Sequence, residues 1–84
     1  MNLATLFKTR YLPHVRRTLK PRTVAEYERL AERVILPALG ILELAALTLD
    51  RVEEFHVGTP GQVQANRALA VLSAALSYAV ERGL

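Results

Sequence analysis

The sequence predicts an all-α fold, a compact four-helix orthogonal bundle, and three observations favour it. Apolar residues recur at the i, i+3, i+4 spacing of helices that bury one face. Prolines stand at two expected helix starts, and no stretch shows the alternation of a strand. A chain of 84 residues with 51% hydrophobic residues can form one domain with a modest core. We therefore expect a single domain over residues 1–84.

The first helix is expected from about Leu3 to Val15. Its apolar stripe consists of Leu3, Leu6, Phe7, Tyr11 and Val15. Pro13 lies inside this range, and because proline lacks a backbone N–H, an earlier end near Leu12 is the alternative.

The second helix is expected to begin at Pro21, because the N–H that proline lacks would have no partner at a first helical position anyway. Its buried stripe consists of Val24, Tyr27, Leu30, Ala31, Val34 and Ile35. The opposite stripe carries Arg22, Glu26, Arg29 and Arg33. Pro37 should stop this helix, and Gly40 should permit the turn that follows.

An apolar connector, residues 41–47, leads to a third, short helix from Leu49 to about His56. Thr48 is its expected N-cap, because a hydroxyl can accept a hydrogen bond from an unpaired N–H of the first turn. Asp50 suits the positive end of the helix dipole. Val57 and Gly58 should end the helix.

The fourth helix is expected to be the long spine of the bundle. Thr59 as N-cap, Pro60 as first residue and Gln62 three after the cap form a capping box. The helix should run to Arg82, with Gly83 as its C-terminal cap. Its expected buried face is Ala65, Ala68, Leu69, Leu72, Ala75, Leu76, Ala79 and Val80. Its other side carries mostly small residues: Asn66, Arg67, Ala70, Ser73, Ala74 and Ser77.

Basic residues are concentrated between the first and second helices. Of the eleven lysines and arginines, four fall within seven positions: Arg16, Arg17, Lys20 and Arg22. No acidic residue precedes Glu26, although the net charge is only +3. Such a cluster is either a phosphate-binding surface or a solvated corner between two helices, and charge alone leaves both open.

Several classes of site are not expected. Without cysteine, neither a disulfide framework nor a thiolate zinc site can form. His14 and His56 lack the spacing and acidic partners of a metal site, and no glycine-rich phosphate loop is present. No apolar run suggests a membrane span. We therefore expect no cofactor, no metal and no membrane partner.

Four stretches together resemble the SAM-like core-binding domain of the phage integrase family of tyrosine recombinases. The stretches are Leu19–Thr23 with Tyr27, Ile35–Gly40, Leu44–Thr48 with Val52, and Ala65–Leu69 continuing through Leu72, Ser73, Tyr78 and Ala79 to Gly83. No single stretch is specific, but all four occur in register. The resemblance covers the chain from about Leu3 to Leu84.

The resemblance implies a DNA-binding module of a site-specific recombinase, active in the bacterial cytoplasm on integrating or prophage DNA. Such a domain forms half of a clamp around duplex DNA, and a C-terminal catalytic domain, absent from this chain, forms the other half. The expected partners are double-stranded DNA, that catalytic domain and neighbouring protomers. The chain itself is expected to be non-catalytic. His14 and Arg17 match the form of a catalytic box of the family, but they precede the DNA-binding helices and are not assigned that role.

The second and fourth helices would lie along the major groove, and eight residues are the candidate contacts. They are Arg16, Arg17, Lys20, Arg22, Thr23, Gln64, Asn66 and Arg67. Free N–H groups at the start of the second helix attract phosphate, and arginine and asparagine can contact phosphates or base edges. We expect one patch across the starts of both helices.

Each candidate also has a structural interpretation. Thr23 would only cap its helix, Asn66 would pack against a neighbouring loop, and Tyr27 is expected in the core. The alternative function is a helical protein–protein interaction module that uses the small-residue face of the fourth helix or the first helix.

Overall fold

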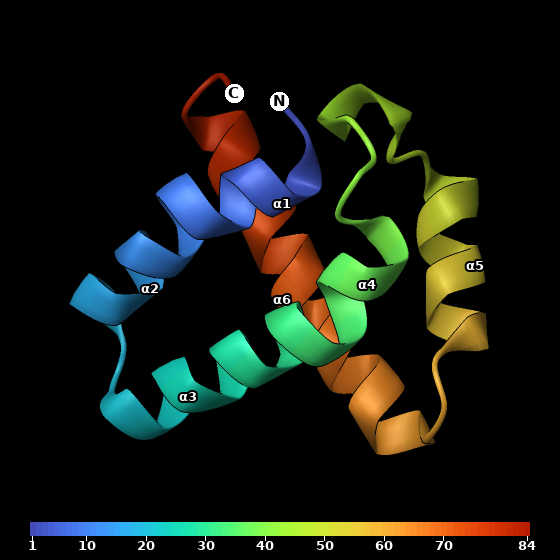
Figure 1. Cartoon of the computed structure of the whole chain (residues 1–84), viewed down its shortest axis with the longest axis horizontal. Coiled ribbons are helices and arrows are strands. Elements are labelled where there is room, and N and C mark those ends of the chain that lie inside the picture. The colour runs from blue at the N-terminus through green and yellow to red at the C-terminus, as the bar shows by residue number, and fades with distance from the viewer.

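In the computed structural model, which describes residues 1–84, helices make up nearly the whole chain, as the sequence predicts. The 20-residue helix α6 (Gln62–Glu81) crosses behind the helix that begins with α1 and the helix that ends with α4, and both chain ends lie at the top of this view (Figure 1). The only pairing of extended backbone is an isolated bridge between Asn2 and Glu43. The predicted all-α class is confirmed.

The first helix does not end at Pro13. Helix α1 (Leu3–Leu6), the π-helical segment η1 (Phe7–Tyr11) and helix α2 (Leu12–Thr18) form one continuous helix. The Leu12 N–H bonds to the Phe7 carbonyl, five residues back, so a widened turn comes directly before the proline. This turn places Pro13 in the opening turn of α2, where a missing N–H costs little.

The same arrangement recurs in the second helix, so the expectation that Pro37 stops it was wrong. Helix α3 (Pro21–Leu30) passes through the π-helical segment η2 (Ala31–Ile35) into helix α4 (Leu36–Leu39). The Leu36 N–H bonds to the Ala31 carbonyl, and Pro37 follows in the first turn of α4. Pro21 begins the helix, as predicted.

The connector after α4 closes over the beginning of the chain. The N–H groups of Leu3 and Ala4 donate to the carbonyls of Leu42 and Gly40, each at 2.9 Å, and the Asn2 side chain accepts from Thr5 N–H at 2.8 Å. These bonds satisfy N–H groups that the first turn of a helix leaves unpaired. The connector then forms a short 3₁₀ helix, η3 (Leu44–Ala46).

Helix α5 (Leu49–Gly58) confirms the predicted third helix and its cap. The Thr48 hydroxyl accepts from the Arg51 N–H at 3.4 Å, and Asp50 lies in the first turn. The helix extends to Gly58, slightly past the expected end at His56.

The predicted capping box of the fourth helix is wrong, because α6 begins at Gln62 rather than at Pro60. The Thr59 hydroxyl donates to the Phe55 carbonyl at 2.6 Å and so completes the end of α5. Gly61 then turns the chain with φ of 80°, a conformation that favours glycine. A hydroxyl between two helices can form a hydrogen bond with either one, and here it bonds to the preceding helix.

The expected cap at the other end of α6 is confirmed. Gly83 has φ of 69°, and its N–H bonds to the Val80 carbonyl while the Leu84 N–H bonds to that of Ala79. This pair of bonds is a Schellman motif.

The core lies where the helix Leu3–Thr18, the helix Pro21–Leu39 and α6 meet. Its largest fully buried side chains are Phe7, Leu3, Leu6, Leu30, Ile35, Leu72 and Val15. On α6 the buried stripe contains Val71, which was not predicted, whereas Val80 is 79% exposed and Leu69 and Leu76 are only partly buried. The other five residues of the predicted face, Ala65, Ala68, Leu72, Ala75 and Ala79, are buried, so most of the prediction is confirmed and the buried side is turned slightly toward Val71.

Candidate nucleic-acid interface

The basic cluster lies at the corner where α2 ends and α3 begins. Arg16, Arg17, Lys20 and Arg22 are all exposed, and the chain between them is extended at Leu19 and Lys20. Figure 1 shows this connection at one extremity of the molecule. We call these four residues the basic corner.

Within the basic corner, only Arg16 has an ionic partner. Its guanidinium donates to the Glu28 carboxylate of α3 at 3.0 Å, which ties α2 to α3. Arg17, Lys20 and Arg22 form no ion pair within the chain. Three cations of the corner are therefore available to an external anion.

The start of α3 has no side-chain cap. The N-cap residue Lys20 supplies no acceptor and Pro21 has no N–H, so the N–H groups of Arg22 and Thr23 point out of the first turn without a capping side chain. The Thr23 side chain is exposed and forms no cap bond, so its alternative interpretation as a helix cap is not what the structure shows. A helix start of this kind, beside several cations, attracts an anion.

The other three predicted residues lie in the first two turns of α6 and divide between two neighbours. Gln64 Oε1 accepts from Arg29 Nη1 at 3.4 Å, and Arg67 Nη1 lies 3.7 Å from Glu26 Oε1, so both face α3. Asn66 instead bonds His56 of α5 through its Oδ1, at 2.8 Å from Nε2. The packing alternative for Asn66 is therefore realised, against α5 rather than a loop.

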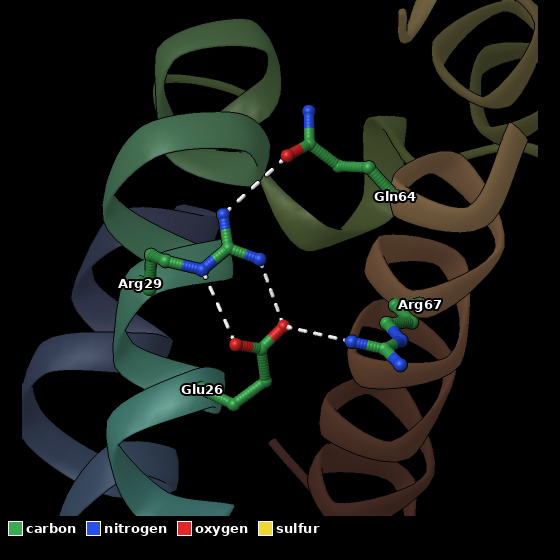
Figure 2. A network of polar contacts seen from close by, with 4 residues as sticks. All are labelled: Glu26, Arg29, Gln64 and Arg67. Carbon is green, nitrogen blue, oxygen red and sulfur yellow. Dashed lines mark hydrogen bonds and ion pairs between the residues drawn. The ribbon is translucent and has the colours of Figure 1, made fainter. Parts of the chain in front are cut away.

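A polar network joins α3 to α6 (Figure 2). Arg29 donates to both oxygens of Glu26, from Nε at 3.2 Å and from Nη2 at 2.8 Å. The hydrogen bonds from Arg29, and with them the positive charges of Arg29 and Arg67, lower the pKa of the Glu26 carboxyl below its ordinary value. We call Glu26, Arg29, Gln64 and Arg67 the α3–α6 network.

The starts of α3 and α6 do not adjoin, contrary to the single patch expected. They lie on opposite sides of the molecule in Figure 1, and α3 spans most of the distance between them. Arg29, which the sequence analysis did not select, shares the outward stripe of Arg22 and Glu26 and meets α6. Its place on that stripe could have indicated Arg29 from the sequence. Only the crossing of α3 and α6, however, brings it into contact with the other candidate residues.

An aromatic cluster lies where the helix Leu3–Thr18 meets α6. The Tyr11 ring is buried, 5.5 Å from Tyr78 and 6.5 Å from the half-buried Tyr27, consistent with the core position expected for Tyr27. The centre of the His14 ring lies 4.8 Å from that of Tyr78. The Arg82 guanidinium stacks over the Tyr78 ring, 4.0 Å from the ring centre. His14 is thus a packed side chain within this cluster.

No group of three or more histidine or acidic side chains is arranged to hold a metal ion. No helix combines the length and the apolar character needed to cross a membrane.

Comparison with known proteins gives one match. The family model described as phage integrase, N-terminal SAM-like domain, matches residues 5–57, which is more than half of the chain and extends from α1 into α5. No curated protein and no solved structure matches.

Proposed function

Because the chain belongs to the phage integrase N-terminal SAM-like domain family, we propose that it is a duplex-DNA-binding module of a site-specific tyrosine recombinase. In this role the domain over residues 1–84 grips DNA as one half of a clamp. The other half would be a catalytic domain elsewhere in the recombinase, and strand cleavage would belong to that domain.

The basic corner is the observation that carries the proposal. Arg17, Lys20 and Arg22 are exposed cations without a partner in the chain, next to an uncapped helix start. Phosphate oxygens accept hydrogen bonds from side chains of this kind and from the backbone N–H groups of a first helical turn. We propose that Thr23 adds its hydroxyl to the same contact.

The second contact in the proposal lies along α3 toward the start of α6. Arg67 is exposed, and Gln64 and Arg29 meet beside it. Asn66 uses its carbonyl oxygen on His56, so its amide N–H groups are the donors that would reach DNA. Arg16 would first have to exchange Glu28 for a phosphate, or would act through its charge alone.

The test is the salt dependence of binding to a short duplex, followed by fluorescence anisotropy. Each phosphate contact releases counterions and contributes roughly 0.9 to the slope of log affinity against log salt. The wild-type chain should bind weakly, as half a clamp, and affinity should fall steeply between about 50 and 200 mM salt. The double variant K20E/R22E should lose binding, and any residual slope should be smaller by roughly 1.8.

A matched control is the double variant K8E/R51E, which makes the same change in net charge outside the basic corner. Both residues are exposed and form no ion pair. It should weaken binding far less than K20E/R22E. Equal losses in both variants would show that only net charge matters, and a wild-type chain without salt-dependent binding would refute the proposed function.

A second candidate function is contact with a neighbouring copy, favoured by the surface of α5. Leu49 and Val57 are 73% and 84% exposed, beside the carboxylates of Asp50, Glu53 and Glu54. The exposed Lys8 and Arg10 of a second copy would complement that charge. An increase of mass with protein concentration in the absence of DNA, measured by sedimentation, would favour this function.

A further inference from the structure

Glu26 is a single carboxylate between two arginines of different helices. Its Oε1 lies 2.8 Å from Arg29 Nη2 and 3.7 Å from Arg67 Nη1, and its Oε2 accepts from Arg29 Nε at 3.2 Å. Figure 2 shows the carboxylate between the two guanidinium groups, with Gln64 beyond Arg29. One negative charge is therefore shared by two positive charges at the junction of α3 and α6.

The two arginines are held unequally. Arg29 grips both carboxylate oxygens, and its partner is three residues away on the same helix. Arg67 makes one long contact to an oxygen that Arg29 already binds more closely, and the Arg67 side chain is 63% exposed. Because a long, exposed ion pair contributes little free energy, Arg67 can leave while the pair between Glu26 and Arg29 stays intact.

The Glu26 carboxylate occupies the position that an anionic oxygen would take at this surface. Two guanidinium groups, one from α3 and one from α6, converge on it, and guanidinium forks bind the oxygens of phosphate as they bind those of carboxylate. Without Glu26, two like charges would face each other and an external phosphate would be their natural partner.

We propose that Glu26 competes with DNA phosphate for Arg67. While DNA is absent, the carboxylate holds Arg67 at the α3–α6 junction. When the domain binds DNA, a phosphate replaces Glu26 as the ionic partner of Arg67, and Glu26 remains paired with Arg29. Glu26 thereby limits affinity for DNA of any sequence, since every complex that uses Arg67 must first break this pair. This inference rests on the proposed function and concerns the regulation of the same surface.

The test is a double-mutant cycle on binding to a short duplex of arbitrary sequence at low salt. E26Q keeps the shape of the side chain and removes the charge, so affinity should rise roughly two- to fivefold, the range of a surface ion pair. R67Q should weaken binding. E26Q/R67Q should bind like R67Q alone, because the gain from E26Q acts through Arg67.

The matched control is E32Q, which removes one carboxylate from an exposed position on the same helix that forms no ion pair. Its gain should be clearly smaller than that of E26Q. Thermal melts of all variants should show one cooperative transition, as expected for changes to partly exposed surface residues.

The inference is overturned if E26Q binds DNA no more tightly than the wild type, if E32Q gives the same gain, or if the gain persists in the R67Q background. Weaker binding by E26Q would mean that Glu26 braces Arg67 in the binding geometry. These results leave the proposed function standing as long as the wild type binds and K20E/R22E does not. Absence of wild-type binding overturns both.

Discussion

Tyr11 is the residue at which burial most changes the chemistry of a side chain. It is 5% exposed and stands among Phe7, Tyr27 and Tyr78. Burial, with a smaller contribution from the charge of Tyr27, raises the pKa of Tyr11 from 10.0 to about 12. The folded state therefore favours the neutral phenol more strongly than the unfolded state does.

This difference predicts alkaline destabilisation. A pKa raised on folding contributes stability that is fully present below the unfolded value of 10.0 and is lost as pH rises through about 12. The variant Y11F has no proton to lose there. Denaturant unfolding at neutral pH and between pH 10 and 12 should show that the wild type loses more unfolding free energy than Y11F does. Equal losses would mean that ionisation of Tyr11 is not coupled to folding.

At the same scale, the exposed cations are predictable from the sequence, but their partners are not. Charge and position along the chain indicate Arg16 and Arg67, and both are exposed. Glu28 and Glu26, which pair with them, lie 12 and 41 positions away along the chain. Local patterns contain helix faces but not the crossing that brings α3 against α6, so these pairs, and the role of Arg29, could not be read from the sequence.

The elements themselves were largely predictable, because apolar periodicity marks a helix that packs on one side. The errors occurred where local chemistry allows two outcomes. Pro37 is expected to end its helix, and Pro13 allows an earlier end of the first one, but a π-helical turn before each proline relieves the missing hydrogen bond. Thr59 is expected to cap α6, but its hydroxyl bonds to the end of α5 instead.

Gly40 and Gly58 provide a matched test of how the helices are joined. A Cβ on Gly40 would lie 2.6 Å from the Leu36 carbonyl oxygen, and the Gly40 carbonyl accepts the N–H of Ala4. G40A should therefore displace the backbone that covers the start of α1 and cost about 1–3 kcal/mol of unfolding free energy.

A Cβ on Gly58, at the end of α5, would meet nothing within 4 Å, and the residue is helical. G58A should stabilise the protein by about 0.4–1 kcal/mol, because alanine restricts the unfolded chain. Denaturant unfolding measures both changes. Similar effects of the two substitutions would show that close packing at Gly40 is not what holds the connector on α1.

On the scale of the whole molecule, α3 links the basic corner to the start of α6, because it begins at Pro21 and carries Glu26 and Arg29, which contact Arg67 and Gln64. The family model ends at residue 57, before α6, so it does not cover Gln64 and Arg67, whose contacts with α3 come from the structure alone. The crossing of α3 and α6 thus brings the polar residues of α6 beside the helix that begins at the basic corner, whereas α5 lies at the opposite side of the molecule from that corner (Figure 1).

The most direct test of this account is a chemical-shift titration of the chain with duplex DNA. Two-dimensional amide spectra report every backbone position in one experiment, and the chain is small enough for complete assignment. We expect perturbations to concentrate at residues 16–23 and 64–67, with a smaller response at Arg29, and to fade as salt is added. Perturbations centred on α5, residues 49–58, with residues 16–23 and 64–67 unchanged, would contradict it.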